Sequence, residues 1–343
     1  MECDGIGPEI VKATLRVLEA ATRQGPSLDL VPLSSGRSAI QSHGDPLPES
    51  TIAALAECDG WIMGPHDSES YPPDMQSRNP SGLLRRHFDL YANFRPAKTY
   101  PGVRSLAGSA DMVVVRENTE GFYADRNMFI GSGEFMPTPD VALAVGVFTR
   151  KGARRIAETA FRLARSRRRL IAVVHKHNVF RLAYGLFLEE TRAVAASYPD
   201  VTAEEYIVDA MTAHLLRRPG HFDVILTTNM MGDILSDMTA ELTGSLGLAA
   251  GMNAGDTHAM AQAAHGSAPD IAGKGVANPT GIMLSTAQLM RWLADRHEDP
   301  PALRAGERIE AAIAATFEAG IRTRDLGGTA GTDEFTAAVV ERV

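Results

Sequence analysis

The sequence predicts an α/β protein built from two domains. Its 343 residues are enough for a large core, and chains of this size usually divide into two domains of about 100–200 residues each. Short β-branched runs, which are typical of buried strands, occur along the chain together with longer segments whose apolar residues recur at helical spacing. Strands and helices in one chain indicate a sheet covered by helices.

Four segments carry the clearest helical pattern. The segment 8–23 begins with a proline, which suits the first turn of a helix, and its apolar residues follow at helical spacing. The others are 154–166, which is amphipathic and basic, and 282–296 and 302–319 near the end of the chain. We interpret their apolar stripes as core packing.

Four strand-like runs each lead into a charged or amide side chain. The runs 112–115, 170–175, 206–208 and 222–228 are followed by Arg116, Lys176, Asp209 and Asn229. Ligands of α/β proteins bind beyond the carboxyl ends of the strands. One such residue more often marks an exit into solvent, but four together favour an active site.

Composition and charge argue against several classes of protein. Acidic residues outnumber basic ones, 42 to 34, which argues against a nucleic-acid binder. Two cysteines, Cys3 and Cys58, are too few for a disulfide framework or a cysteine metal site, so we expect a reducing, cytoplasmic compartment. The first residues do not form a secretory signal, and apolar runs such as 141–148 are too short to cross a membrane.

Two aspartates four residues apart are candidate metal ligands. Asp233 and Asp237 share one face if the segment is helical, and a hard divalent cation would relieve their repulsion. Alternatively, they are acidic residues favoured near a helix N-terminus. Asp209 is a plausible third ligand if the fold brings it close.

Arginines and two further side chains are candidates for substrate binding and proton transfer. Arg85, Arg95 and Arg116 suit bidentate binding of carboxylates, although each alone could be a solvated surface charge. Lys176 could act as a base if nearby cations lower its pKa, and Tyr123 could return a proton to a carbanion.

The two glycine-rich segments do not by themselves identify a cofactor site. The segments 4–9 and 265–279 match neither the dinucleotide fingerprint nor the phosphate-binding loop, although their small residues allow close approach to a cofactor. The segment 121–148 is rich in glycine and proline and has little helical pattern. It is either a surface loop or an excursion that pairs with another subunit.

Six long motifs occur in the order found in one protein family. They are Asp4-Gly-Ile-Gly-Pro-Glu9, the segment 84–96, Arg116-Glu-Asn-Thr-Glu-Gly-Phe-Tyr123, His175-Lys-His-Asn178, Gly232-Asp-Ile-Leu-Ser-Asp237 and the segment 265–279. With these motifs the sequence closely resembles the isocitrate/3-isopropylmalate dehydrogenase family of β-decarboxylating dehydrogenases, which includes homoisocitrate, tartrate and D-malate dehydrogenases. The likeness covers essentially the whole chain, through the segment 325–331.

The resemblance implies an isopropylmalate dehydrogenase-like fold, in which two α/β domains flank a cleft and the cofactor site is not of the Rossmann type. We place a cofactor-side domain at 1–91 plus 244–343. The substrate, metal and dimerisation domain is then 92–243, with an arm near 121–148. The resemblance also implies a homodimer with active sites shared between its chains.

The resemblance further implies NAD-dependent oxidative decarboxylation of a 3-substituted (R)-malate with Mg²⁺ or Mn²⁺. By match, Arg85, Arg95 and Arg116 bind the carboxylates of this small hydroxy acid. Asp233 and Asp237 hold the metal together with the partner's Asp209. The partner's Lys176 assists removal of the hydroxyl proton, and Tyr123 protonates the enol.

The matching cofactor residues are His265, Gly266, Ser267, Ala268, Asp270, Ile271 and Asn278. His265 resembles the residue that stacks on adenine, and Asn278 resembles an adenine contact. The pair at 270–271 resembles the NAD branch of the family, and a carboxylate there would also repel the 2′-phosphate of NADP.

Residues just before Arg85 are expected to recognise the substrate side chain. Arg78, Asn79 and Ser81 stand where leucine-pathway enzymes often have a glutamate and paired leucines. The pattern resembles homoisocitrate dehydrogenases and favours a polar C3 substituent, as in isocitrate or homoisocitrate. A 3-isopropylmalate or tartrate/D-malate substrate stays open, as does a purely surface role for Arg78.

Two departures from the family pattern stand out. Only three residues precede Asp4, where relatives have a strand of about six residues, and Cys3 replaces the usual glycine. We expect either a start that lies upstream or a sheet that lacks a strand and leaves backbone groups unpaired. Gln262 stands where a glutamate is common near the nicotinamide ribose.

A non-catalytic regulatory subunit is the remote alternative. Such subunits keep the fold and lose catalytic residues, whereas every expected catalytic position is occupied here. A plain binding protein would need no proton carrier.

Overall fold

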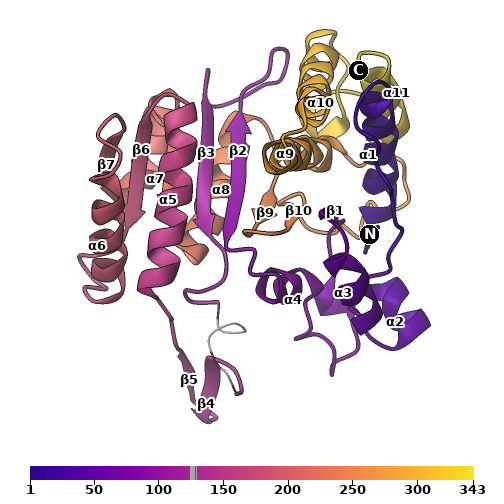
Figure 1. Ribbon diagram of the computed structural model, residues 1–343. Helices are drawn as coiled ribbons and strands as arrows, with labels where there is room; N and C mark the ends of the chain where they lie inside the picture. Colours follow the sequence, from indigo (N-terminus) through magenta and orange to yellow (C-terminus); the bar gives the residue numbers. More distant parts are fainter. Residues whose placement is uncertain (124–127, 129) are drawn as a thin grey trace.

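The computed structural model describes residues 1–123, 128 and 130–343. Its largest element is a mixed sheet, whose strands within these ranges follow the order β1-β10-β9-β2-β3-β8-β6-β7 (Figure 1). The strands are β1 Gly60–Ile62, β2 Ala92–Lys98, β3 Asp111–Glu117, β6 Leu170–His175, β7 Thr202–Ile207, β8 Val224–Thr227, β9 Met252–Ala254 and β10 Ala259–Ala261. This mixed α/β architecture confirms the predicted fold class.

The parallel part of the sheet places several polar residues at one edge. Strands β3, β8, β6 and β7 pair in parallel, whereas β2 is antiparallel to both β3 and β9. Carboxyl ends of parallel strands meet at the same edge of a sheet. Arg116 in β3, Asn229 after β8, Lys176 after β6 and Asp209 after β7 therefore share that edge.

The strand predictions hold with differences at the boundaries. Strand β6 coincides with the predicted run, and β3 extends to Glu117, so Arg116 lies inside the strand rather than after it. Strand β7 begins at Thr202, well before the predicted start at 206, and Val208 already belongs to a helix. The early part of β7 is polar and largely exposed, as suits an edge strand, so its sequence lacks an apolar run.

All four predicted helices are confirmed within a few residues, as α1 Gly7–Thr22, α5 Arg150–Ser166, α9 Thr280–His297 and α10 Pro300–Glu318. The starts of two follow from capping: Thr149 accepts a hydrogen bond from the Gly152 N–H, and Asp299 accepts one from the Ala302 N–H. The other helices are α2 Arg37–His43, α3 Glu49–Ala56, α4 Pro80–His87, α6 Ala183–Ala195, α7 Val208–Arg217, α8 Asn229–Thr243 and α11 Thr332–Val340. No helix in the described part of the chain is long and apolar enough to cross a membrane.

Separate hydrophobic cores form on the two sides of the molecule. Helices α5 and α6 cover one face of the parallel strands, and α7 and α8 cover the other (Figure 1). Helices α1, α9, α10 and α11 pack together in another core made from both ends of the chain. The domain boundaries at 91 and 244 stay a prediction.

A hairpin of β4 Glu134–Thr138 and β5 Val141–Ala144 projects from the body of the molecule (Figure 1). All nine of its strand residues are exposed, including Phe135, Met136 and Leu143. It falls within the predicted arm at 121–148, of which residues 124–127 and 129 lie outside the described residues. Two exposed faces on an isolated hairpin give it little stability of its own.

The first residues lie beside β1, which is an edge strand of the sheet. The Met1 amino group donates to the Ile62 carbonyl at 2.9 Å, and the Gly64 N–H donates to the Met1 carbonyl at 3.0 Å. Cys3 has φ 61°, in the left-handed region that favours glycine. A residue with a side chain in this conformation carries about 1–2 kcal/mol of backbone strain.

Candidate active site

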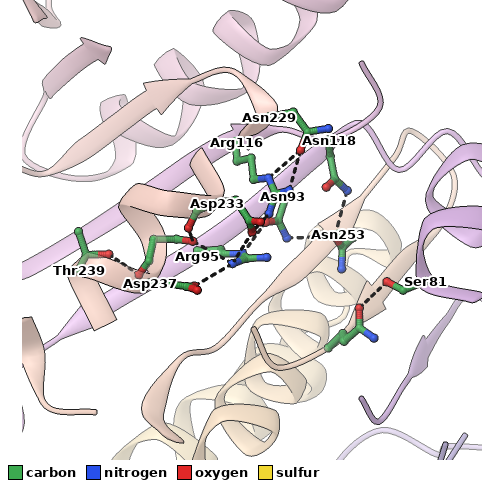
Figure 2. Close-up of polar contacts among 12 residues, drawn as sticks. Ser81, Asn93, Arg95, Arg116, Asn118, Asn229, Asp233, Asp237, Thr239 and Asn253 are labelled. Atoms are coloured by element: carbon green, nitrogen blue, oxygen red, sulfur yellow. Dashed lines mark hydrogen bonds and ion pairs between the residues drawn. The ribbon is translucent and has the colours of Figure 1, made fainter. Parts of the chain in front are cut away.

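Two buried arginines and two aspartates meet at the edge described above. Arg95 comes from β2 and Arg116 from the neighbouring strand β3. Helix α8 packs against both strands and supplies Asp233 and Asp237 from one face, as the four-residue spacing predicts. Figure 2 shows the two guanidinium groups converging on these carboxylates.

Arg116 is held in place by an amide and a carboxylate. Its Nε and Nη2 both donate to Asn229 Oδ1, at 2.9 and 2.6 Å, and its Nη1 forms an ion pair with Asp233. A Cβ at Gly232 would lie 2.6 Å from the Arg116 side chain, so only glycine leaves room for this approach of α8 to β3. The guanidinium carbon lies 5.5 Å from the centre of the Tyr123 ring.

Arg95 is likewise buried, and its Nε and Nη1 both have partners. Its Nε donates to Asn93 Oδ1 at 2.7 Å, and its Nη1 donates to Ser236 Oγ at 2.8 Å. The same Nη1 lies 3.3 Å from Asp233 and 3.4 Å from Asp237. Burial and the nearby charge of Arg116 lower the pKa of Arg95 to about 10, so it stays cationic at neutral pH.

The two aspartates lie in different electrostatic environments, which shift their pKa values in opposite directions. Burial alone would raise the pKa of Asp233, but the charges of Arg116 and Arg95 outweigh it and the pKa is lowered. At Asp237 burial prevails over the charge of Arg95 and raises the pKa. Tyr123 donates its hydroxyl hydrogen bond to Asp233 Oδ2 at 2.5 Å, which places a phenol proton within the cluster.

A chain of buried amides links this cluster to Arg85 on α4. Asn253 Oδ1 accepts from both Asn93 Nδ2 and Asn118 Nδ2 at 3.0 Å (Figure 2). Arg85 Nη1 donates to Asn118 Oδ1 at 3.3 Å, and its Nη2 donates to Gln262 Oε1 at 3.4 Å. All three predicted substrate arginines therefore belong to one polar network.

Lys176 and Asp209 lie elsewhere on the same edge and contact each other. The hydrogen bond from Lys176 lowers the pKa of the Asp209 carboxyl. Asp209 is not brought to Asp233 and Asp237, since no group of three or more histidine, cysteine or acidic side chains suited to a metal occurs among the described residues.

The two glycine-rich segments pack against each other. Ile6 N–H donates to the Ser267 carbonyl at 2.9 Å, and a Cβ at Gly5, whose φ is +57°, would lie 2.0 Å from that oxygen. Glu9 accepts hydrogen bonds from the N–H groups of Gly275 and Ala277. The segment at 4–9 thus shapes the loop at 265–279 rather than forming a separate site.

Within that loop the predicted cofactor residues differ in exposure. His265 Nε2 is buried without a hydrogen-bond partner among the described residues, and burial lowers the pKa of its ring. Asn278 Nδ2 donates to Asp325 at 2.9 Å, and Asp270 lies exposed in a turn. A buried, neutral imidazole beside an exposed carboxylate suits an adenosine group, with its base against the ring and its hydroxyls against the carboxylate.

Comparison with known proteins assigns the fold and these motifs to one family. The sequence model described as Isocitrate/isopropylmalate dehydrogenase matches residues 1–339. The chain belongs to the isocitrate/isopropylmalate dehydrogenase family. This result confirms the resemblance noted from the motifs.

Individual family members resemble the chain over nearly its full length. An isocitrate/homoisocitrate dehydrogenase of Thermus thermophilus is 42% identical over 99% of this chain and 96% of its own. A 3-isopropylmalate/3-methylmalate dehydrogenase of Methanocaldococcus jannaschii is 38% identical over 100% and 97%. The crystal structure of isocitrate dehydrogenase from Methylococcus capsulatus superposes with a TM-score of 0.89 at 38% identity, covering 99% of this chain and 97% of that one.

In this member of the isocitrate/isopropylmalate dehydrogenase family, the three predicted substrate-recognition residues all have partners within the chain. Arg78 forms an ion pair with Asp45 at 2.7 Å, and Asn79 caps α4 by accepting from Gly82 N–H. Ser81 is buried and donates to Gln262 Oε1 at 2.7 Å. Their role in recognising substrate stays a prediction.

Several residues of the network were assigned no role from the sequence. They are Asn93, Asn118, Asn253 and Ser236, whereas Asn229 was noted only as the polar residue after one strand-like run. Asn93, Asn118 and Ser236 lie inside the family motifs, so closer attention to uncharged motif residues could have found these three. Asn253 lies in β9, a strand of three residues that no sequence pattern predicts.

The carboxylates of Asp233 and Asp237 provide some of the oxygen ligands that a divalent cation needs. Asp233 and Asp237 offer carboxylate oxygens one helical turn apart, and oxygen ligands are those that a hard cation prefers. Burial raises the pKa of Asp237, and a cation bound beside it would favour the ionised carboxylate. Further oxygen ligands must come from outside this pair.

Proposed function

We propose that this family member is an NAD-dependent, Mg²⁺- or Mn²⁺-requiring dehydrogenase that oxidises a 3-substituted (R)-malate and then decarboxylates it. The observation that carries the proposal is the convergence of Arg95, Arg116 and Tyr123 on Asp233, beside Asp237. Such a set can bind a multiply charged carboxylic acid, hold a cation and deliver a proton within one small volume.

The arginines bind and orient the substrate. Arg95 and Arg116 are buried, so their attraction for carboxylates is little screened by water. Arg85 reaches the same network from α4, across the line between the two predicted domains. Three guanidinium groups suit the two carboxylates of malate and a third polar group on its C3 substituent.

The proton carriers act at two different atoms. A base removes the proton of the C2 hydroxyl as C2 is oxidised to a ketone, and Lys176 is the residue we assign to this step. Loss of the β-carboxylate as CO₂ leaves an enol, and the Tyr123 hydroxyl protonates it at C3. When bound, NAD⁺ accepts the hydride from C2 and the divalent cation stabilises the developing enolate.

Lys176 and Asp209 act in this proposal from the partner subunit of a homodimer. Both lie away from Asp233 within one chain, so a shared site requires a second copy. Exposed apolar side chains on the hairpin and on the outer face of α8, among them Phe135, Met136 and Ile234, supply a surface that a second copy would cover.

A polar C3 substituent, as in isocitrate or homoisocitrate, is our preferred substrate class. The buried Ser81 and Gln262 and the half-buried Arg85 form a polar wall rather than an apolar slot, in which Ser81 lies in the first turn of α4 and Arg85 in its last turn. A 3-isopropylmalate or tartrate/D-malate substrate is the alternative. Of the two relatives named above, one is an isocitrate/homoisocitrate dehydrogenase and the other a 3-isopropylmalate/3-methylmalate dehydrogenase.

Steady-state kinetics of the purified protein test the proposal. We expect metal-dependent formation of NADH with isocitrate or homoisocitrate, and weaker activity with 3-isopropylmalate, D-malate and tartrate. Chelation of the metal should abolish activity, and added Mn²⁺ should restore it. A clear preference for 3-isopropylmalate would overturn the polar substrate class, and no NADH with any of these acids would overturn the function.

A substitution at Asp270 tests the cofactor assignment separately. Asp270→Lys should weaken NAD⁺ use and improve NADP⁺ use, because a cation replaces the carboxylate expected to bind the ribose hydroxyls. Lys274→Asp in the same loop is the matched control. An unchanged ratio of kcat/KM for the two cofactors in Asp270→Lys would contradict the assignment.

A further inference from the structure

A cavity of about 140 Å³ lies between the core of the parallel strands and the core of the terminal helices. Lys98 ends β2 and Asp111 begins β3, and these two residues, which line the cavity, pair across the sheet (upper ends of β2 and β3 in Figure 1). Both side chains are exposed, so the mouth of the cavity lies at the surface. Arg116 lies near the other end of β3, so the cavity and the arginine cluster occupy opposite edges of the sheet.

One part of the cavity wall is apolar. Ala240 of α8, Leu248 and Leu284 of α9 line it, and all three are buried. A cavity of about 150 Å³ in a protein core is large enough for a molecule the size of benzene. Water alone would leave the apolar wall hydrated, which is unfavourable. The cavity therefore suits a molecule of about six to ten non-hydrogen atoms that has an apolar part.

Three hydrogen-bond donors in the wall lack a partner among the described residues. Gln288 Nε2 is buried and unbonded, which costs free energy as long as no acceptor reaches it. Neither the Tyr100 hydroxyl nor the Lys98 ammonium group has a hydrogen bond or ion pair within the described part of the chain. Burial and the nearby carboxylates of Glu310 and Asp111 raise the pKa of Tyr100, so its hydroxyl keeps a proton to donate. Two neutral donors and a cation together suit a carboxylate.

Two carboxylates line the same cavity. Asp111 forms an ion pair with Arg167 at 2.8 Å, and Glu310 forms one with Arg291 at 2.8 Å. An ionised carboxylate has about four acceptor sites, so both can accept a further hydrogen bond. With Lys98 and Arg167 the wall carries two cations and two anions, and its formal charges cancel. A molecule with both an ammonium group and a carboxylate, and no net charge, matches this wall.

We propose that the cavity is a binding site for a free amino acid with a short aliphatic side chain, such as valine. Its carboxylate accepts from the three unpaired donors, its ammonium group is balanced by Asp111 and Glu310, and its side chain packs against Leu248 and Leu284. In this position the ligand contacts both cores and bridges β2 and α9. The site does not depend on the proposed reaction, so its test requires no turnover.

Isothermal titration calorimetry of the full chain with valine tests the site. We expect one valine per chain with a Kd below about 1 mM, an affinity in keeping with so small a ligand. Isovalerate lacks the ammonium group and isobutylamine lacks the carboxylate, so each should bind at least about tenfold more weakly than valine. Because valine binds only the folded chain, Tm should rise with its concentration. No detectable binding of valine would overturn the site, and equally tight binding of isovalerate would overturn the ligand class.

Two substitutions in the wall locate the bound valine. Gln288→Leu and Lys98→Met each remove a donor to the carboxylate and should weaken valine binding about tenfold or more. The matched controls are Gln41→Leu and Lys151→Met, at exposed side chains outside the cavity, which should bind valine as the wild type does. If Gln288→Leu does not fold, Lys98→Met at the exposed mouth still decides. Wild-type affinity for valine in Lys98→Met would overturn the proposed location.

Discussion

Single side chains of the active site are oriented by amides as much as by charges. Asn229 shows this most clearly, since its Oδ1 accepts two bonds from Arg116 and its Nδ2 donates to the Glu120 carbonyl at 2.9 Å. It thereby joins an arginine of the substrate cluster to the segment that leads to Tyr123. A misplacement of about 1 Å at a reacting group can lower a rate about 100-fold, so such links matter for catalysis.

Asn229→Ala should lower kcat by about 10–100-fold, because both Arg116 and Tyr123 lose their alignment. Asn229→Asp keeps the acceptor for Arg116 but loses the donor to Glu120, so we expect a smaller loss. The measurement is kcat and KM of each variant at full metal saturation, with Ser166→Ala at the exposed end of α5 as control. Wild-type kcat in Asn229→Ala would contradict the positioning role.

Glu120 is a second residue whose environment shifts its pKa, and this shift should make the stability of the protein depend on pH. Burial and the neighbouring Glu117 raise the pKa of its carboxyl to about 7, against the hydrogen bonds that it accepts from Thr149. The folded state therefore binds a proton more tightly than the unfolded state, and this contribution to stability is lost as pH rises from about 4.5 to about 7.

Glu120→Gln should flatten that part of the pH dependence, because glutamine does not titrate. The difference between the unfolding free energies of wild type and variant should change by on the order of 2 kcal/mol between pH 5 and pH 8. Urea unfolding at several pH values measures this difference. Parallel curves for the two proteins would show that Glu120 titrates normally.

At the scale of elements, a buried ion pair fixes the start of β8 against the turn between α5 and β6. Asp223 is fully buried and accepts hydrogen bonds from Arg167 Nε and from the Arg168 N–H, each at 2.8 Å. Its carbonyl accepts from Val113 of β3. This contact sets the register of three strands far from the arginine cluster.

Asp223→Ala should destabilise the protein by about 3–5 kcal/mol while leaving kcat unchanged at temperatures where it stays folded, because it leaves buried donors without their partner. Asp200→Ala, which removes the exposed ion pair with Arg165, should cost no more than about 1 kcal/mol. Chemical denaturation of both variants gives the comparison. Equal losses of stability in the two variants would contradict the expectation that the buried ion pair contributes more than the exposed one.

For the whole molecule, the arrangement of the proposed site means that two copies of the chain must associate before either is active. Lys176 pairs with Asp209 in this chain and is separate from the cluster at Asp233, so each site requires residues of two copies in our proposal. A C2 dimer would supply them symmetrically.

Mixing two inactive variants tests the shared site. Lys176→Met and Asp233→Asn should each be inactive alone, whereas their heterodimer contains one site with both defects and one intact site. Co-expression should therefore restore up to about one quarter of wild-type activity, since half of the dimers are mixed and each has one working site. Mixing Lys176→Met with the doubly substituted chain should restore none. If the mixture of Lys176→Met and Asp233→Asn forms mixed dimers but shows no activity, Lys176 and Asp233 act in the same site from one chain, and the shared site is contradicted.

The sequence by itself determined several elements and the family, because these depend on local patterns: helical periodicity at 282–296 and 302–319, a β-branched run at 170–175, and six ordered motifs. It also identified Arg95, Arg116, Asp233 and Asp237 as a set. Only the tertiary structure decided that Asn253 on a three-residue strand joins two parts of the network, and that Asp209 lies apart from the other aspartates in one chain. Those facts depend on packing between segments distant in the chain, and no local pattern encodes which polar groups face one another.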